Sequence, residues 1–308
     1  MNHSGFNLIT ILGHTAGGKT SVSAHLAFKL NGEIISADSR QVYRGMDIGT
    51  GKDYNDYMVS GVKIPFHLID IVDAGYEYNL FEYQQNFADA YERVVEAGHL
   101  PILCGGSGLY IEAVIKNYKM LRVPLNQELR NRLDDKGMDE LEALLKSYGS
   151  LHNISDTSSR KRMIRAIEIA EYQSAGTEES TLLPELNPLI VGINYNRETR
   201  RNRITERLRS RIEGGMIEEV ERLLESGVQH EKLKYYGLEY KYVSHYLQGE
   251  INRAQLFNSL NTAIHQFAKR QMTYFRGMER RGLEIRWLDG DLTTEEKVGK
   301  IELWYNAI

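Results

Sequence analysis

The first 110 residues alternate between short apolar runs and stretches with helical spacing. Asn7–Leu12 is a mostly apolar run, and the residues after it, at 18–31, carry apolar side chains four apart, as on one buried face of a helix. Further strands are expected at 33–37, 64–71 and 100–104, and further helices at 80–97 and from residue 107. Strands that alternate with helices predict a parallel sheet with helices on both of its faces.

The pattern changes between residues 120 and 186, where helical spacing dominates. Helices are expected at 127–133, 139–148 and 158–172, and no strand-like run separates them. Beyond this stretch we expect a strand at 188–194, long helices at 197–226 and 252–278, a last strand at 283–288 and a closing helix. The sequence therefore predicts an α/β core over 1–119 and 187–308, interrupted by an all-helical insertion at 120–186.

The composition is that of a globular protein. The 308 residues are 42% hydrophobic and 26% charged, which is enough for a core without disulfides or metal. A mean hydropathy of -0.44 and the lack of a long apolar run argue against a membrane protein, and the short segment before Leu8 leaves no room for a signal peptide. The single cysteine, Cys104, excludes an intrachain disulfide. These features predict a cytoplasmic protein without membrane contact.

The net charge of -4 does not exclude a nucleic-acid partner, because the charged residues are unevenly distributed along the chain. Residues 1–110 carry 7 Lys and Arg against 12 Asp and Glu, whereas the remaining residues carry 31 against 30. The arginines of the second part are bunched at 160–165 and on one helical face formed by Arg200, Arg203, Arg207 and Arg211. Such a stripe is typical of a solvated face, yet like charges on one face repel each other, and a phosphate-rich ligand would relieve that repulsion.

The strongest motif is Gly13–Thr20, which reads GHTAGGKT and matches the P-loop pattern G-x-x-x-x-G-K-[ST] in full. It lies between a predicted strand and a predicted helix, so its backbone N–H groups and the helix dipole would face phosphate oxygens. Lys19 supplies a cation, and the Thr20 hydroxyl is placed for Mg²⁺. We therefore expect a P-loop NTPase-like parallel sheet flanked by helices, which binds a diphosphate or a triphosphate.

Two later strand ends add side chains to the same crevice, because the carboxyl ends of parallel strands meet at one edge of a sheet. Asp38 follows the second strand and can hold Mg²⁺ through water or accept a proton. Ser107 follows a pair of glycines, and its hydroxyl can donate and accept hydrogen bonds. Taken alone, each has a simpler interpretation, Asp38 as a helix N-cap and the glycine turn as a packing device.

The helix expected at 252–278 contains a polar residue in its apolar stripe. Gln271 stands in the middle of the stripe formed by Ile264, Ala268, Phe275 and Met278. A buried Gln needs partners, which are either structural or a ligand such as the edge of a base. The neighbouring face carries Lys269, Arg270, Thr273 and Arg276.

Together these motifs resemble the tRNA dimethylallyltransferase (isopentenyltransferase) family over nearly the whole chain. The resemblance rests on five segments, namely Gly13–Thr20, Ile35–Thr50, Gly105–Tyr110, Arg162–Glu168 and Ala268–Thr273. The second, which ends in GMDIGT, is not found in ordinary P-loop kinases. The resemblance implies transfer of a dimethylallyl group from dimethylallyl diphosphate to N6 of adenosine 37, beside the anticodon of tRNAs that read codons beginning with U, with Mg²⁺ as cofactor.

The resemblance also implies a role for each matching residue. Catalysis would fall to Asp38, Lys19 and Ser107, with Asp38 taking the proton of adenine N6. The diphosphate would be bound by Gly13, His14, Thr15, Ala16, Gly17, Gly18, Lys19 and Thr20, with Arg203 and Arg207 as our candidates for further contacts, and Mg²⁺ by Thr20. The anticodon stem-loop would contact Asp38, Ser39, Arg40, Gln41, Ser107, Lys161, Arg162, Met163, Ile164, Arg165, Lys269, Arg270, Gln271, Thr273 and Arg276 of a monomeric enzyme, with the insertion as a clamp.

The chain departs from the family pattern at a few positions. His14 stands where the family has Pro, and Ser107 where it has Thr. Tyr235–Tyr240 reads YYGLEY where the family has a G-Y-[KR] run, so a basic residue is lost near the expected RNA path. We expect no C-terminal zinc finger of the kind that some eukaryotic members carry, in keeping with the single cysteine.

Two other activities share part of this pattern. An adenylate isopentenyltransferase, which acts on free AMP, ADP or ATP, would use the same P-loop and Asp38 but would not need the insertion or the basic clusters. A small-molecule P-loop kinase would use Asp38 to activate a hydroxyl and would release ADP.

Overall fold

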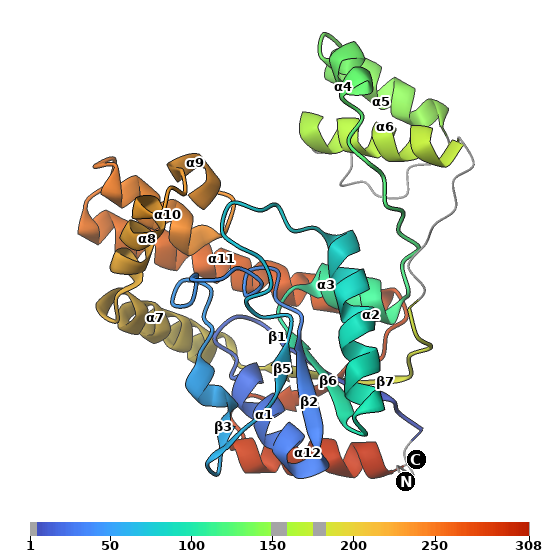
Figure 1. The fold of residues 1–308 in the computed structure, drawn as a ribbon. Helices are drawn as coiled ribbons and strands as arrows, with labels where there is room; N and C mark the ends of the chain where they lie inside the picture. Colours follow the sequence, from blue (N-terminus) through green and yellow to red (C-terminus); the bar gives the residue numbers. More distant parts are fainter. Residues whose placement is uncertain (1–4, 149–158, 175–182, 308) are drawn as a thin grey trace. The chain divides into compact units, whose positions relative to one another are not determined.

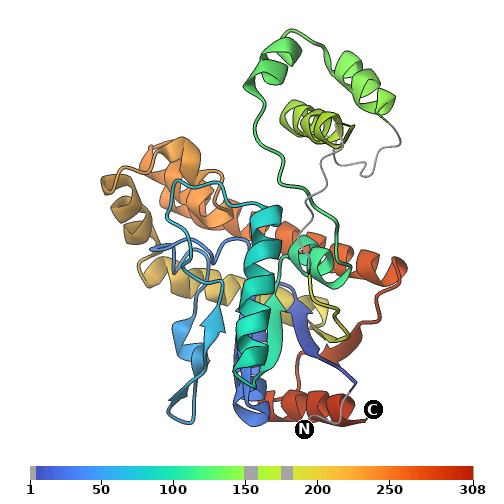
Figure 2. The same cartoon turned by 45° about the vertical axis from the view of Figure 1, so that its right-hand side comes forward.

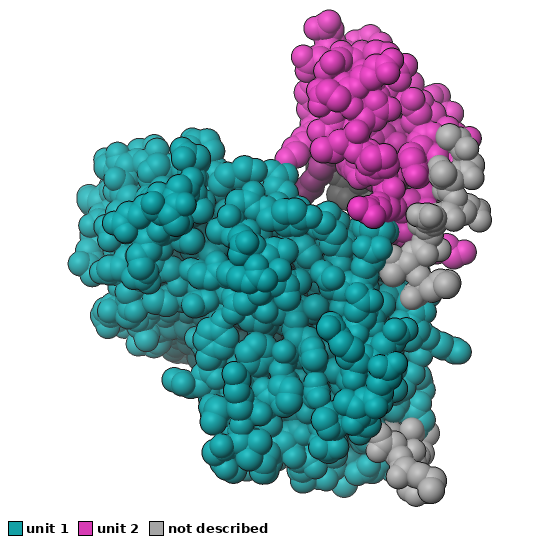
Figure 3. Space-filling view, in the orientation of Figure 1, with its two compact units in different colours: residues 1–117, 183–308 teal, residues 118–182 magenta. Residues whose placement is uncertain are grey.

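The computed structural model describes residues 5–148, 159–174 and 183–307. The chain divides into two compact units (Figure 3). A core unit comprises residues 1–117 and 183–308, and a second unit comprises residues 118–182. The sequence predicts a helical insertion at 120–186. The second unit begins two residues before this predicted insertion and ends four residues before its end.

The core unit is built on a six-stranded sheet with the order β5-β2-β6-β1-β7-β8 (Figure 1). All five neighbouring pairs are parallel. The strands are β1 (Leu8–Gly13), β2 (Gly32–Ser36), β5 (Phe66–His67), β6 (Leu100–Gly105), β7 (Pro188–Asn194) and β8 (Arg286–Asp289). The predicted fold class, a parallel sheet flanked by helices, is confirmed. The central position of β1 places the loop after it between the ends of β6 and β7.

Successive side chains of the central strands contribute to two separate hydrophobic cores, one on each face of the sheet, because side chains alternate between the faces along a strand. Leu8 and Leu12 of β1 pack with α2 (Leu80–Glu96), α3 (Gly108–Ile115) and α11 (Arg253–Arg280) on one face (Figures 1 and 2). Ile9 and Ile11 pack with α1 (Lys19–Leu30) and α12 (Thr294–Asn306) on the other face. Because both faces are covered, the strands read as continuous apolar runs in the sequence.

Three predicted elements differ in extent from the structure. The strand expected at 283–288 lies at 286–289, and backbone conformation explains the other two differences. The strand expected at 64–71 is limited to β5, since Leu68 and Asp70 have φ values of 62° and 56°, outside the extended region. The helix expected at 197–226 is two helices, α7 (Arg197–Glu213) and α8 (Met216–Glu225), because Gly215 adopts a φ of 100° between them.

Several short elements have no counterpart in the sequence analysis. They are the 3-10 helix Tyr54–Tyr57, the hairpin of β3 (Met58–Val59) and β4 (Val62–Lys63), α9 (His230–Leu233) and α10 (Leu238–Leu247). All of these except α10 have four residues or fewer, which is too short for a clear hydrophobic period. Within the described residues, no helix is both long and apolar enough to cross a membrane.

The described residues of the second unit form three helices, α4 (Gln127–Leu133), α5 (Met138–Ser147) and α6 (Arg160–Ser174). Its small core consists of Leu129, Leu133, Leu141, Leu145, Met163 and Ile167. The buried Glu168 carboxylate crosses this unit to Arg130, with N–O distances of 2.6 and 3.0 Å, and also accepts a hydrogen bond from Arg165 at 2.9 Å. Burial acts to raise the pKa of Glu168, but the hydrogen bonds from Arg130 and Arg165 outweigh it, so the pKa is lowered.

Candidate functional site

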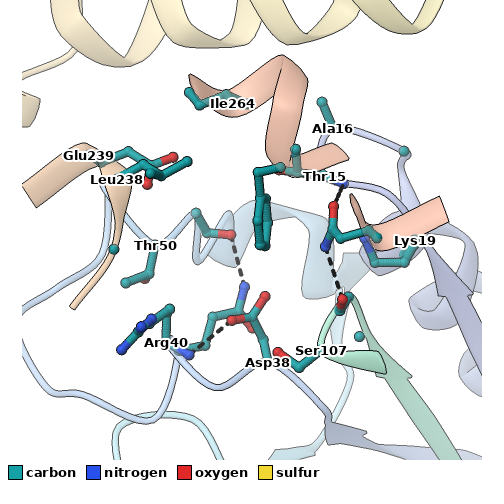
Figure 4. A pocket seen from close by; sticks show the side chains of 18 of the residues that line it. Thr15, Ala16, Lys19, Asp38, Arg40, Thr50, Ser107, Leu238, Glu239 and Ile264 are labelled. Atoms are coloured by element: carbon teal, nitrogen blue, oxygen red, sulfur yellow. Dashed lines mark hydrogen bonds between the residues drawn. The ribbon is translucent and has the colours of Figure 1, made fainter. Parts of the chain in front are cut away.

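A cavity of about 1130 Å³ opens at the carboxyl ends of β1, β2 and β6 in the core unit. Its wall brings together residues from segments that are far apart in the sequence, namely 15–20, 38–41, 49–57, 104–110, 202–211, 234–241 and 264–274. Figure 4 shows Lys19, Thr15 and Ala16 on one side, with Leu238 and Glu239 across the cavity from them. Asp38 and Ser107 lie next to each other in the same view.

The P-loop has the backbone geometry that its glycines predict. Gly18 is in the left-handed region, with φ 71°, and forms the N-cap of α1. Gly13 lies so close to the neighbouring strand β7 that an added Cβ would lie 2.7 Å from the Ile193 carbonyl oxygen. Lys19 points back along the loop, where its Nζ donates to the His14 carbonyl at 2.9 Å. Burial lowers the pKa of Lys19, and the charge of Asp38 acts in the opposite direction.

His14, which stands where the resembling family has proline, is a fully buried neutral side chain. Its Nδ1 donates to the Thr15 carbonyl at 2.6 Å, and its ring meets Tyr195 edge to face at 5.7 Å. Burial lowers the pKa of His14 to about 4. His14 therefore adds no charge to the loop at neutral pH, and its imidazole acts there as a packing group.

Two arginines of α7 reach the P-loop. Arg203 Nε donates to the Ala16 carbonyl at 3.0 Å, and its guanidinium lies 4.7 Å from the centre of the Tyr195 ring. Arg207 donates to the Thr15 hydroxyl at 3.4 Å and to the Asp53 carboxylate at 3.0 Å. The partners of this arginine stripe in the structure are thus a loop carbonyl, a hydroxyl, a carboxylate and an aromatic ring. The guanidinium groups lie where they could contact phosphate held by the loop.

The other two members of the stripe lie differently. Arg211 is largely buried, 3.8 Å from Asp53, and burial lowers its pKa to about 10. Burial likewise lowers the pKa of Arg200, and the charges of Arg276 and Arg197 lower it further. Arg200 is not among the residues that line the cavity, whereas Arg211 is.

Asp38 and Ser107 are brought together by the ends of β2 and β6. Ser107 Oγ accepts from the Ser39 amide at 3.0 Å and donates to the Ser39 hydroxyl at 3.2 Å. Asp38 Oδ1 accepts from the Arg40 amide at 2.9 Å, which orients the carboxylate. Its Oδ2 has no hydrogen-bond partner within the described residues. Ser107 therefore positions the turn that carries Asp38, and one oxygen of Asp38 is left for a ligand.

The GMDIGT segment has a structural explanation that the sequence analysis did not supply. The buried Glu219 carboxylate of α8 accepts from the amides of Asp47, Ile48 and Gly49 at 2.8, 2.7 and 3.0 Å. The buried Lys52 ammonium donates to the Tyr43 carbonyl at 2.6 Å. These two residues hold the loop against the cavity, where the side-chain amide of Gln41 donates to the Gly51 carbonyl at 3.1 Å.

Gln271 ties two loops of the site together through its side-chain amide. Its Oε1 accepts from the Thr15 amide at 2.9 Å, and its Nε2 donates to the Gly106 carbonyl at 2.9 Å. Of the two interpretations left open above, the structural one describes the observed contacts. Gln271 connects the P-loop to the glycine turn before Ser107, although it also lines the cavity.

The basic residues around Gln271 are exposed. Lys269, Arg270, Thr273 and Arg276 all lie on the solvent side of α11. Arg270 also lines the cavity, beside Phe267. The Thr273 hydroxyl donates to the Lys269 carbonyl one turn earlier, at 3.0 Å.

The cluster on α6 is divided between core and surface. Met163 is 1% exposed and belongs to the core of the second unit, which corrects its expected role in RNA contact, because a side chain at that position faces the neighbouring helices. Ile164 packs against the same core, and Arg165 donates to Glu168 and to the Val123 carbonyl. Lys161 and Arg162 are exposed.

Several residues of the cavity wall could not be placed there from the sequence. Tyr235 and Phe267 are exposed aromatic residues that line it, and Leu238 and Ile264 are apolar ones. Glu239 lines it where the resembling family has a basic residue, and burial raises the pKa of its carboxyl group against the charge of Arg211. Within the described residues, no group of three or more His, Cys, Asp or Glu side chains is arranged to hold a metal ion.

Comparisons with known proteins point to one family. The IPP transferase family model matches residues 41–278. A curated relative from Bacteroides fragilis, tRNA dimethylallyltransferase 2, is 56% identical over 297 residues, which are 96% of this chain and 97% of that protein. The crystal structure of tRNA isopentenylpyrophosphate transferase from Bacillus halodurans is 30% identical, with a TM-score of 0.70 over 97% of this chain and 95% of that one.

A third similarity concerns the fold alone. The structure of a eukaryotic dimethylallyltransferase acting on tRNA has a TM-score of 0.76, with 22% identity over 96% of this chain and 77% of that one.

Proposed function

The chain belongs to the IPP transferase family, as its motifs predict, and we propose that it transfers a dimethylallyl group from dimethylallyl diphosphate to N6 of adenosine 37 in tRNAs that read codons beginning with U. The observation that carries this proposal is the meeting of a P-loop, two arginines and an oriented carboxylate in one cavity. A diphosphate held at the loop and an amine held at Asp38 would face each other there.

The diphosphate of the donor is assigned to residues 13–20, with Arg203 and Arg207 as further contacts. Both arginines already donate to groups of the P-loop, so they need little rearrangement to meet phosphate oxygens. When the C1–O bond breaks, its electron pair leaves with the diphosphate. Lys19, the loop amides and the arginines stabilise that developing negative charge.

Asp38 acts on the acceptor. The N6 amine of adenine attacks C1 of the donor, and a C–N bond forms as the C1–O bond breaks. Asp38 Oδ2, which has no partner in the described residues, takes the proton that N6 loses. Ser107 holds the Ser39 turn next to it, so its contribution is to position the carboxylate.

One residue of the P-loop fits a magnesium ion that enters with the donor. Thr20 lines the cavity beside Lys19, and its hydroxyl would hold the ion together with phosphate oxygens. Mg²⁺ bound by Thr20 and phosphate oxygens would neutralise charge on the leaving diphosphate.

The RNA is assigned to exposed residues of both units. An adenosine in a stacked loop has to be extruded to reach Asp38 inside the cavity. Ser39, Arg40, Gln41 and Arg270 line that cavity, whereas Lys269, Thr273 and Arg276 on α11 and Lys161 and Arg162 on α6 lie on exposed surfaces suited to phosphates.

The test is a transfer assay with labelled dimethylallyl diphosphate and Mg²⁺, in which an unmodified anticodon stem-loop RNA and AMP are offered separately. Label on the RNA alone is expected. Label on AMP alone would replace this proposal with adenylate isopentenyltransferase activity. Label on neither acceptor, with ADP released when ATP is supplied in a separate reaction, would indicate a kinase.

The role of Asp38 is tested in the same assay with Asp38→Asn and, as a control, Asp89→Asn, an exposed carboxylate on α2. Turnover by Asp38→Asn should fall about 100-fold to 10,000-fold, because the amide cannot take a proton. Asp89→Asn should match the parent. Normal turnover by Asp38→Asn would remove Asp38 from this role.

A further inference from the structure

Two exposed aromatic rings lie at the cavity of the core unit. The exposed aromatic residues among those described are Phe28, Tyr54, Tyr76, Tyr148, Tyr235 and Phe267. Only Tyr235 and Phe267 of these line the cavity, with 39% and 40% of their surfaces exposed. They come from different elements, Tyr235 from the turn between α9 and α10 and Phe267 from the middle of α11. Large apolar side chains left exposed around a binding cavity indicate contact with a ligand.

An arginine accompanies each ring. The Arg40 guanidinium lies 5.1 Å from the centre of the Tyr235 ring, and that of Arg270 lies 6.0 Å from the centre of the Phe267 ring. Both arginines also line the cavity. Tyr235 is further held by Tyr236, which it meets edge to face at 5.5 Å. The rings are therefore oriented, each paired with a cation, while much of their surface stays open.

Extrusion of a nucleotide creates a need for such surfaces. When the target adenosine leaves the stack of the anticodon loop, its two neighbours lose a stacking partner. Proteins that bind unstacked bases offer them aromatic rings and guanidinium planes. Resting on the proposed function, we propose that Tyr235 and Phe267 stack against the bases of the nucleotides that flank the extruded adenosine.

The chemistry of the surroundings favours RNA over an apolar protein segment. Arg40 and Arg270 accompany the two rings, Lys234 and Lys241 line the same cavity, and an RNA backbone that carries negative charge complements these cations. Arg40 also lies two residues after Asp38, with its amide bound to the Asp38 carboxylate. A base on Tyr235 is thus held beside the segment that receives the target base.

This role accounts for the departure of Tyr235–Tyr240 from the family pattern. Glu239 occupies the place of a basic residue, so this segment offers no phosphate contact at that position. A stacking contact by Tyr235 would hold RNA without releasing counterions. Its contribution to affinity is therefore independent of salt, unlike that of a lysine.

The test is binding of an anticodon stem-loop RNA that carries 2-aminopurine next to the target adenosine. The variants are Tyr235→Ala, Phe267→Ala and Tyr235→Phe, with Phe28→Ala as a control because Phe28 is an exposed aromatic residue of α1 that does not line the cavity. Each alanine variant at the cavity should weaken binding about 5-fold to 100-fold and reduce the quenching of 2-aminopurine. The slope of log Kd against log salt should not change. Tyr235→Phe and Phe28→Ala should behave like the parent.

Parent-like affinity and quenching in both alanine variants would overturn the inference. A changed salt slope would overturn it as well, since that result would mean that phosphate contacts had been lost. Failure of the proposed function looks different, because the parent protein itself would then neither bind nor prenylate the RNA.

Discussion

Two basic segments of similar composition, 160–165 on α6 and 269–276 on α11, use their charges differently. On α6, Arg160 donates to the carbonyls of Leu133, Asp134 and Lys136, where α4 ends, and so acts as a cap for that helix. On α11, the basic side chains are exposed and the polar residue that turns inward is Gln271. A basic cluster in a sequence therefore does not by itself indicate a binding surface. The neighbouring elements determine which of its side chains form internal hydrogen bonds and which remain exposed to solvent.

The largest expected effect is the difference in stability between removing a buried and an exposed carboxylate of the second unit. Glu168→Ala removes a buried carboxylate that accepts from Arg130 and Arg165, and should destabilise this unit by about 3–5 kcal/mol. Glu171→Ala breaks an exposed pair with Arg132 and should cost at most about 1 kcal/mol. Hydrogen exchange of α6 amides measures both. Equal protection in the two variants would mean that the buried pair contributes nothing.

On acidification, the two units should lose stability in different pH ranges. The unfolded chain takes up a proton at His14 near pH 6.5, whereas the folded chain resists it until about pH 4. The core unit should therefore lose about 3 kcal/mol as pH falls through that window. Glu168 has a lowered pKa, so its contribution to the second unit persists until the pH falls below about 4.5.

Urea unfolding monitored by tryptophan fluorescence measures the first effect, since Trp287 and Trp304 both belong to the core unit. The comparison variant is His14→Gln, in which the titrating group is absent. Its stability should change less between pH 6.5 and pH 4. Identical pH profiles for parent and variant would contradict the assignment to His14.

A smaller effect is expected from the inward-facing residue of α11. Gln271→Ala leaves the Thr15 amide and the Gly106 carbonyl without their partner, at a cost of about 1–3 kcal/mol. Because both groups belong to loops of the site, kcat/KM for the donor should fall about 10-fold to 100-fold. Gln266→Ala, on an exposed position of the same helix, should leave it unchanged. Steady-state kinetics at saturating RNA decides between these results.

The smallest effects come from single exposed cations. Lys269→Ala and Arg162→Ala should each raise the KM for RNA and reduce the salt slope of binding by about 0.7, as expected for one phosphate contact with a single strand. Lys300→Ala, which changes an exposed residue of α12, is the control. A reduced slope in Lys269→Ala alone would restrict the RNA surface to the core unit.

Regular elements with a strong period were predictable, and irregular ones were not. The helix at 127–133 and the strand at 188–194 agree with the structure to the residue. The break between α7 and α8 and the short β5 depend on backbone angles at Gly215, Leu68 and Asp70, and single residues leave little trace in a hydrophobic pattern.

The site shows the same division. Lys19, Asp38 and Ser107 belong to motifs at the ends of predicted strands, which is enough to place them at one edge of a parallel sheet, and all three line one cavity. The roles of Glu219 and Lys52 could not be predicted from the sequence. Charged residues are usually exposed, and only the structure shows the backbone amides and carbonyls that these two side chains bind.

The sequence alone determined the local conformations, namely the P-loop turn, the strand that precedes it and the helix that follows. These depend on residues close together in the chain, such as the glycines at 13 and 18. Two contacts of the site could not be predicted from local residues. Gln271 accepts a hydrogen bond from Thr15, 256 residues away, and Arg203 donates one to the Ala16 carbonyl. Contacts of this kind depend on how helices pack on the sheet, and helical periodicity identifies a buried face without identifying what that face meets.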